Sequence, residues 1–245
     1  GMPGGMVWDP HVYVSIAKDG TVTIVSHRSE MGTGSRTSLP MVVADEMEAD
    51  WSKVKIVQAE GDETKYGNQD TDGSRSVRHF IQPMRACGAA MRQMLERAAA
   101  VTWNCPDTEV KAQNHKVVHI PSGNSLGFGE LAEAAAKLPT PAAKQINLKD
   151  PSQFRYIGKG QVQIIDLHDI TTGKADYAQD IVIPGMKFAV VARPPVVGGK
   201  VKSFDEAAAM KVPGVVKVVQ IAPTPAPGKF APLGGVAVIA DSTYA

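Results

Sequence analysis

An excess of charge of either sign is absent from this chain. Lys plus Arg total 26 and Asp plus Glu total 25 among 245 residues, which leaves a formal net charge of +1. Proteins that bind nucleic acids or membrane surfaces usually carry a basic excess or patch. Here the basic residues are scattered and are not interleaved with aromatic residues. The charge pattern therefore argues against nucleic-acid and membrane-surface partners.

Long apolar runs are also missing. The longest are only a few residues, so no segment is predicted to span a bilayer. Residues 1–5 contain neither a basic region nor an apolar core, so no export signal is visible. We expect a cytoplasmic protein, or a periplasmic one if a signal was removed before Gly1.

Cysteine is scarce, with only Cys87 and Cys105 in the chain. Two thiols cannot hold an iron–sulfur cluster that needs four, and they cannot form a disulfide framework. Cys87 falls on the apolar stripe of a predicted helix, where a free cysteine usually acts as a small buried hydrophobic residue.

The pattern of apolar residues predicts a first unit of mixed helices and strands over residues 8–138. Alternation on both sides of Lys18-Asp19-Gly20 predicts a β-hairpin of residues 11–17 and 21–26. Helical spacing predicts a helix over 39–47 with Pro40 in its first turn, and a long helix over 77–101 that Pro83 kinks or interrupts near Gln82. The remaining predicted elements are a buried strand at 55–59, a loop at 61–73, a short strand at 117–120 and a short helix at 129–138.

The second half of the chain has a different texture. Residues 139–167 begin with a proline-containing stretch and are predicted to form an extended linker. Residues 168–245 form a second predicted unit, which has no closing element after its last strand. Its predicted elements are valine-rich strands at 186–192, 215–221 and 235–240, and a short helix at 204–210. The expected fold class of the whole chain is α+β.

Two glycine-containing segments each open a predicted helix: residues 31–35, Met-Gly-Thr-Gly-Ser, and residues 72–76, Asp-Gly-Ser-Arg-Ser. A helix start presents free backbone N–H groups and a positive dipole end, and glycine lets the backbone approach an anion. Together these features predict a phosphate or pyrophosphate cradle. Side chains that add donors are Thr33, Ser35, Ser74, Arg75 and Ser76. The alternative is that the hydroxyls cap helices and the glycines make turns.

The motifs leave the ligand open. Neither segment is a phosphate-binding Walker loop or a G-x-G-x-x-G dinucleotide fingerprint. Glu30 is the only acid beside the first segment, and it is either a base, a ligand of a cofactor hydroxyl or a structural residue. His115 and His119 have the spacing of a helical zinc site, but their surroundings are strand-like, so we expect no shared metal. No nucleophile elbow or catalytic triad is apparent.

Several motifs occur in a familiar order. The segments of the first unit are Arg28-Ser29-Glu30-Met31-Gly32-Thr33-Gly34, Leu39-Pro40-Met41, Asp50-Trp51-Ser52-Lys53-Val54, Tyr66-Gly67-Asn68 and residues 72–76. They resemble the start of the large molybdenum subunits of the isoquinoline 1-oxidoreductase and bacterial aldehyde dehydrogenase type. These subunits belong to the molybdenum hydroxylases, the family of xanthine dehydrogenase and aldehyde oxidase. Residues 172–177, 183–186, 192–195 and 212–216 resemble the α/β hammerhead domain of the same family.

The resemblance implies a function for both glycine segments. Gly32, Thr33 and Gly34 would lie along the phosphates of molybdopterin cytosine dinucleotide. Gly73, Ser74, Arg75 and Ser76 would hold its pterin side near molybdenum. The implied reaction oxidises an aldehyde or hydroxylates an aromatic N-heterocycle with water as the oxygen source. The implied partners are a small subunit with [2Fe–2S] clusters and the remainder of the large subunit.

Two departures from the family pattern bear on activity. Thr33 stands where the family usually has Gln, so a long amide donor is lost. The family's catalytic glutamate lies in a Gly-Glu-Pro segment that this sequence does not contain. We therefore assign no catalytic or metal-ligating residue and expect the chain alone to be inactive, as part of a larger subunit or complex. The alternative is a non-catalytic binding or assembly module. In either case apolar surface left by an incomplete chain predicts dimerisation or partner contact.

Overall fold

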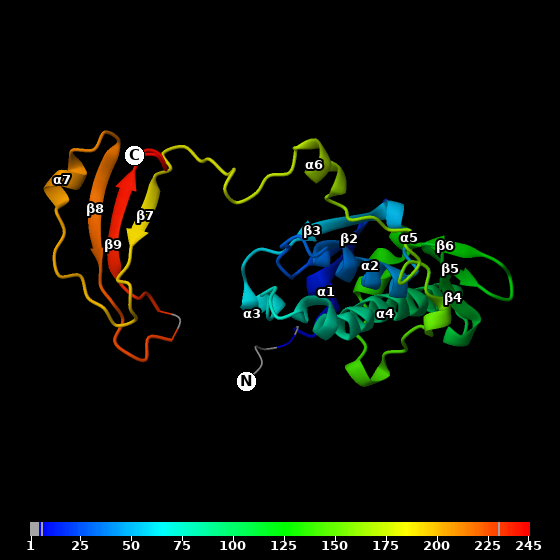
Figure 1. The fold of residues 1–245 in the computed structure, drawn as a ribbon. Helices are drawn as coiled ribbons and strands as arrows, with labels where there is room; N and C mark the ends of the chain where they lie inside the picture. Colours follow the sequence, from blue (N-terminus) through cyan, green and yellow to red (C-terminus); the bar gives the residue numbers. More distant parts are fainter. Residues whose placement is uncertain (1–4, 6, 230) are drawn as a thin grey trace. The chain divides into compact units, whose positions relative to one another are not determined.

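The computed structural model describes residue 5 and residues 7–229 and 231–245. The chain divides into two compact units, Gly1–Ala175 and Asp176–Ala245 (Figure 1). Both units combine helices with β-strands, which confirms the α+β expectation. Within the described ranges, no helix has the length and the hydrophobicity that a membrane span requires.

The first sheet of unit 1 has the order β1-β2-β3. Its strands are β1 (Val14–Ile16), β2 (Val22–Ser26) and β3 (Val54–Gln58). β1 and β2 form the expected antiparallel hairpin, whereas β3 runs parallel to β2. The hairpin starts later than predicted, because Asp9 caps a short helix, α1 (Pro10–Tyr13), and Pro10 suits its first position. The expectation that the third strand is buried was wrong, since β3 is an edge strand with three exposed residues.

The two long helices of unit 1 are α2 (Ser35–Met47) and α4 (Arg75–Trp103), which lie side by side (Figure 1). Both are continuous through an internal proline: Pro40 lies beyond the first turn of α2, and α4 does not end near Gln82. Core packing of nearby residues, Val42 and Val43 after Pro40 and Met84 after Pro83, compensates for the lost backbone hydrogen bonds. The backbones approach so closely that a Cβ on Gly88 would lie 2.5 Å from the Val43 carbonyl oxygen.

A second sheet packs at the other end of α4. It consists of β4 (Val110–Gln113), β5 (Lys116–His119) and β6 (Ser125–Gly127), all antiparallel. It is followed by α5 (Phe128–Ala136), which contacts α4. The sequence analysis found β5 and α5 but not β4 and β6. β5 contains the adjacent valines Val117 and Val118, whereas β4 (Val-Lys-Ala-Gln) and β6 (Ser-Leu-Gly) are short and contain no such apolar pair. The predicted loop at 61–73 also contains a short helix, α3 (Glu63–Tyr66).

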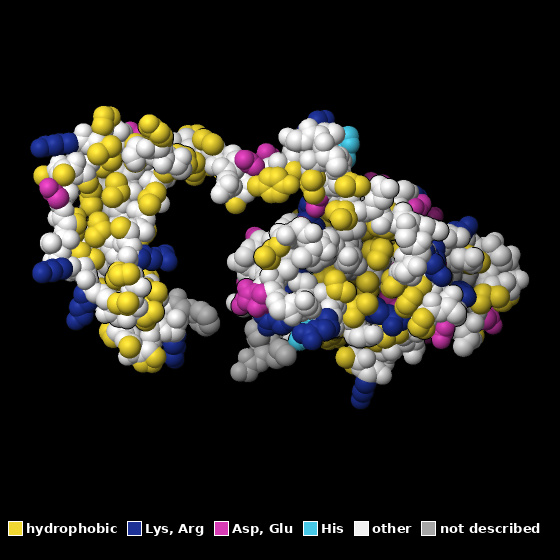
Figure 2. Space-filling model, in the orientation of Figure 1, with side chains coloured by type: hydrophobic (Ala, Val, Ile, Leu, Met, Phe, Trp, Pro, Cys, Tyr) yellow, Lys and Arg dark blue, Asp and Glu magenta, His cyan; other side chains and the backbone are white. Residues whose placement is uncertain are grey.

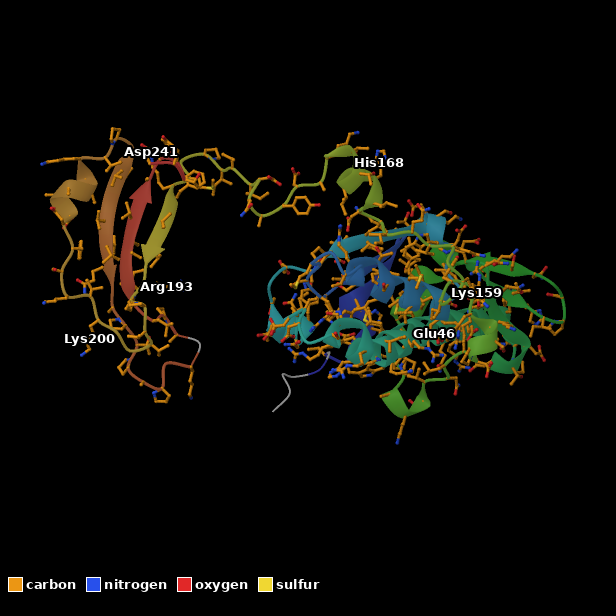
Figure 3. All side chains as sticks on the ribbon, in the orientation of Figure 1. Glu46, Lys159, His168, Arg193, Lys200 and Asp241 are labelled. Carbon is orange, nitrogen blue, oxygen red and sulfur yellow. The ribbon has the colours of Figure 1, made fainter. Side chains whose placement is uncertain are left out.

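The predicted linker at 139–167 differs from an extended connection, because much of it packs on α2. The buried Asp45 carboxylate accepts the amides of Tyr156 and Ile157 at 2.9 Å each. Lys149 is buried and donates to Asp45 at 2.9 Å. Glu46, labelled in Figure 3, lies fully buried beside them and accepts from Arg85 at 2.7 Å. These charged groups attach the segment to unit 1, which ends after α6 (Leu167–Thr172).

Unit 2 is a three-stranded antiparallel sheet in the order β7-β9-β8. Its elements are β7 (Phe188–Ala192), α7 (Glu206–Met210), β8 (Val215–Ile221) and β9 (Gly235–Ala240). The strand and helix positions agree closely with those predicted. Hydrophobic side chains cover much of its visible face (Figure 2), and Val190 in β7 is 65% exposed. The hammerhead assignment of this unit stays a prediction.

Candidate functional site

The two glycine segments lie in loops that open the two long helices. The first loop, residues 27–34, joins β2 to α2, and the second loop, residues 67–74, joins α3 to α4. Gly34 and Ser74 are the N-cap residues, and both have left-handed backbone conformations, with φ of 77° and 56°. The Ser74 hydroxyl makes no capping hydrogen bond, and Gly34 has no side chain that could make one. Hydroxyl capping at these two positions therefore does not explain the motifs.

Two adjacent residues of the first loop connect the helix starts: Arg28 contacts the start of α4, and Ser29 contacts the start of α2. The Arg28 Nε–H donates to the Ser76 hydroxyl at 3.2 Å, at the beginning of α4. The Ser35 hydroxyl donates to the Ser29 carbonyl oxygen at 3.4 Å, at the beginning of α2. Ser76 is also 2.9 Å from the Thr71 hydroxyl in the second loop. The structure therefore brings the two predicted segments together at one edge of unit 1.

Arg28 is a central residue of this edge that the sequence analysis did not select. Its side chain is fully buried, donates to the Asn68 carbonyl oxygen at 2.7 Å and stacks on the Phe80 ring at 4.5 Å. A guanidinium presents several donors in a rigid fork, so one arginine can connect two loops. The available signal was an arginine two residues beyond the end of the predicted strand at 21–26, where a charged residue close to the core needs partners.

Glu30 occupies the amides of the first loop. Its carboxylate accepts from the backbone amides of Met31 and Gly34 at 3.0 Å and of Arg36 at 2.9 Å. Partial burial opposes ionisation, but the amide hydrogen bonds together outweigh it and hold the pKa of Glu30 below its ordinary value. Of the three roles left open for Glu30, this geometry supports the structural one. Its carboxylate caps the N-terminus of α2.

The second loop has a different arrangement. Gly73 and Ser74 are exposed, and both have positive φ angles, 49° and 56°. Among the described residues, no acceptor takes a hydrogen bond from either of their amides. Neither acid of this loop occupies those amides: Asp70 accepts from the Asn68 side chain at 3.4 Å, and Asp72 is paired with Arg75, whose Nε–H donates to it at 2.9 Å. The second loop therefore presents free amides at a helix start, with a cation beside them.

A wide-open surface cavity of about 420 Å³ lies next to the first loop, at the carboxyl ends of the parallel strands β2 and β3. Its lining residues are Ser29, Glu30, Arg36, Gln58, Ala59, Gly61 and Gln69. This described lining includes none of the seven predicted site residues. Gly32 and Thr33 are exposed outside it, and Gly34 and Ser76 are buried. The first loop thus faces two environments, the cavity and the solvent.

Buried polar atoms without a partner concentrate at the same edge. In the described part of the chain, every buried side-chain nitrogen or oxygen that lacks a hydrogen bond belongs to residues 26–36. These atoms are Ser26 Oγ, His27 Nδ1 and Nε2, Arg28 Nη2 and Arg36 Nε. Buried polar groups in folded proteins almost always have partners. Unpaired guanidinium donors from two arginines fit an anionic ligand that would complete the edge.

The two histidines at zinc spacing do not converge. His115 is buried, with one ring nitrogen 2.8 Å from the Gly20 carbonyl oxygen and the other accepting the Asp50 amide at 3.1 Å. Burial lowers its pKa, which favours the neutral ring. His119 has separate partners on another part of the second sheet.

Comparison with known proteins identifies the family. The model of the molybdopterin cofactor-binding domain matches residues 3–180. The chain belongs to this family. The match includes both loops of the candidate site, and it places the chain among the molybdenum hydroxylase large subunits.

Curated relatives share this part of their sequence. The β subunit of isoquinoline 1-oxidoreductase from Brevundimonas diminuta is 31% identical over 86% of this chain and 32% of its own length. The membrane-bound aldehyde dehydrogenase [pyrroloquinoline-quinone] of Gluconacetobacter polyoxogenes is 35% identical over 90% of this chain and 29% of its own length. The chain thus spans about a third of the length of these relatives.

Among solved structures, quinoline 2-oxidoreductase from Pseudomonas putida 86 is similar to part of the chain. The alignment covers 51% of this chain and 16% of that protein, with 20% identity and a TM-score of 0.40.

Proposed function

We propose that the two loops hold the anionic part of a molybdopterin-type cofactor, as the cofactor-binding part of a larger molybdenum hydroxylase subunit. The carrying observation is the set of unpaired buried donors in residues 26–36, next to a second loop with free amides. Helix N-termini bind phosphate through free amides and the helix dipole.

Each residue has a separate role in this proposal. The amides of Gly73 and Ser74, with the Arg75 guanidinium and the Ser76 hydroxyl, bind the pterin side. Gly32, Thr33 and Gly34 lie along the phosphates of the cytosine dinucleotide form. For those amides to bind phosphate, the Glu30 carboxylate must first leave them. The bound cofactor supplies the molybdenum chemistry that takes an oxygen atom from water to the substrate.

We propose an aldehyde or an aromatic N-heterocycle as the substrate class, supported by the names of the relatives, an isoquinoline oxidoreductase and an aldehyde dehydrogenase. The relatives' names include a β subunit, and we propose a small iron–sulfur subunit and the remainder of the large subunit as partners. The chain's two cysteines are compatible with clusters on a separate protein. The name of the aldehyde dehydrogenase relative includes pyrroloquinoline quinone, so the experiment must distinguish this cofactor from molybdopterin.

The test is a cofactor analysis of the purified chain, alone and coexpressed with the proposed iron–sulfur partner and the remainder of the subunit. Molybdenum is measured by mass spectrometry, pterin by fluorescence after oxidation, and cytosine nucleotide and quinone by chromatography. We expect stoichiometric molybdenum, pterin and cytosine nucleotide in the complete assembly. A complete assembly without pterin, or with quinone alone, would refute the proposal.

A matched pair of variants locates the site. Arg75→Gln removes the cation beside the second loop and should weaken pterin affinity at least about tenfold, which lowers occupancy, since a charge-assisted hydrogen bond contributes roughly 1.5–3 kcal/mol. Arg97→Gln removes an arginine from a more exposed ion pair, with Asp107 at 2.7 Å, outside both loops. It should leave occupancy unchanged, and equal loss in both variants would argue against the second loop as the site.

The second candidate function, an assembly module without cofactor, is favoured by one observation. Glu30 satisfies the amides of the first loop without any ligand. This candidate predicts a stable complex with the partner chains and no pterin, whereas the first predicts pterin in the same complex.

A further inference from the structure

Three side chains with metal-binding atoms meet at the end of unit 1 that carries the second sheet. They are Cys105, Glu109 and His119, and their Sγ, carboxylate oxygen and ring nitrogen all lie within 4.8 Å of one another. All three are partly buried. The sequence analysis paired His119 with His115 and had no reason to join it to Cys105, because the three residues come from different elements.

The backbone fixes all three positions. Cys105 follows the end of α4, where Asn104 is left-handed and the Cys105 amide donates to the Ala100 carbonyl oxygen at 3.0 Å. Glu109 ends a 3₁₀ turn, Asp107–Glu109, that leads directly into β4. The Ile120 amide donates to the Glu109 carbonyl oxygen at 2.8 Å. The three donors are therefore held by a helix end and a hairpin, as a preorganised site requires.

A second contact orients the His119 ring. Its Nδ1 is 2.7 Å from the Ser122 hydroxyl, while its Nε2 is 3.3 Å from a Glu109 carboxylate oxygen. If Nδ1 carries the proton and donates to Ser122, the Nε2 lone pair points to the cluster. Metal-binding histidines are typically held in this way by a partner of the other ring nitrogen. The Trp103 ring packs against the imidazole at 5.6 Å between centroids.

We propose that Cys105, Glu109 and His119 form a binding site for a divalent cation of the zinc class. A thiolate, an imidazole and a carboxylate are the ligands that Zn²⁺ and Co²⁺ accept, whereas Mg²⁺ and Ca²⁺ prefer oxygen alone. In a tetrahedral site with bonds of about 2.0–2.3 Å, ligand atoms are roughly 3.3–3.8 Å apart. The separation of His119 Nε2 and the Glu109 carboxylate oxygen, 3.3 Å, already has this value, and the Cys105 Sγ lies within 4.8 Å of the other two ligand atoms. Water takes the fourth position.

The alternative is a local structural cluster, in which His119 is hydrogen-bonded to Glu109 and Ser122 and the Cys105 thiol has no function. The alternative predicts that Cys105 contributes nothing to cation binding. The two interpretations therefore differ in one observable, the bond between the sulfur of Cys105 and a bound metal.

The experiment is a titration of the purified 245-residue chain with Co²⁺ after removal of metals with a chelator. Co²⁺ adopts the geometry of Zn²⁺ and gives a near-ultraviolet charge-transfer band when bound to a thiolate. We expect one equivalent of Co²⁺ to produce this band, and one equivalent of Zn²⁺ to remove it by displacement. No saturable binding of Co²⁺ or Zn²⁺ would overturn the proposal. The readout uses metal alone, so it is independent of the pterin cofactor.

Variants of the two cysteines provide the matched control. Cys105→Ser should abolish the band. Cys87→Ala should keep it, because Cys87 is fully buried on the face of α4 that packs in the apolar core and is not part of the proposed site. Ser122→Ala should weaken Co²⁺ affinity about tenfold, since partners of a metal-binding histidine typically contribute 10–100-fold. A band that survives in Cys105→Ser would overturn the assignment. If Cys105→Ser does not fold by circular dichroism, His119→Gln is used instead, and an unchanged band in that variant has the same meaning.

Discussion

The two loops at the helix starts have similar sequences, but their backbone amides differ in whether they have hydrogen-bond partners. Each contains glycine and hydroxyl residues, and each is connected to Arg28 or Ser29. In the first loop the backbone amides bind the carboxylate of Glu30, and in the second loop the amides of Gly73 and Ser74 are free. The difference arises from the position of the acid. Glu30 precedes its N-cap residue by four positions and folds back onto the amides, whereas Asp72 pairs with Arg75.

This comparison shows that a short glycine motif does not define an anion site by itself. An acid a few residues upstream decides whether the amides are satisfied within the chain or remain available to a ligand. We therefore expect the second loop to bind an anion first, and the first loop only after displacement of Glu30.

The largest expected effect comes from separating the two helices. Gly88→Val places a side chain where Cβ alone would lie 2.5 Å from the Val43 carbonyl oxygen. The helices must move apart, so we expect a loss of about 3 kcal/mol in the free energy of unfolding, measured with denaturant. The control is Gly61→Val, where a Cβ meets nothing within 4 Å. Equal stability of the two variants would contradict the close packing of α2 on α4.

A change of pH should act on the first loop through His27. Burial, and then the nearby charge of Arg28, lower the pKa of His27 to about 4. The unfolded chain protonates this residue near pH 6.5, so stability is fully present above that value and declines as the pH falls to about 4. Over this window we expect a loss of roughly 3 kcal/mol from this group. In His27→Leu the decline measured by denaturant titration should be smaller by that amount, and an unchanged decline would contradict the buried neutral ring.

Removing the charge of Glu30 should make the first loop resemble the second. Glu30→Gln weakens the interaction with the amides of α2, and we expect a loss of about 1 kcal/mol in unfolding free energy at pH 7. Because the pKa of Glu30 is lowered, the difference from the parent chain should shrink as the pH falls below about 4. Glu133→Gln, on the exposed face of α5, is the control and should have no measurable effect. Inorganic phosphate should bind Glu30→Gln more tightly than the parent, and weaker binding would show that Glu30 does not compete with anions.

The smallest expected effect is in the second loop. Ser74 is left-handed, a conformation that disfavours residues with a Cβ, so Ser74→Gly should stabilise the chain by about 0.5 kcal/mol. Thermal unfolding measures this change against Ser152→Gly, a surface position without positive φ, which should be neutral or slightly destabilising. A clear destabilisation by Ser74→Gly would indicate that the Ser74 hydroxyl supports the loop.

Sequence analysis was most successful where local patterns decide the structure. It located the hairpin around Asp19-Gly20, the two long helices and the strands of unit 2, because these depend on periodicity and turn residues. It missed β4, β6 and α6, which are too short for periodicity to be recognised. The attachment of residues 139–167 to α2 was also missed, since it depends on Asp45 and Lys149, separated by 104 positions.

For the candidate site, the sequence by itself determined that two glycine-containing loops open two helices, since helix starts and left-handed turns are properties of neighbouring residues. Only the tertiary structure decided which atoms reach the amides. It turned Glu30 onto the first loop, and it connected Arg28 to Ser76 across 48 positions. Hydrogen bonds require atoms to approach within about 3 Å in a defined direction, and long-range packing alone sets such distances.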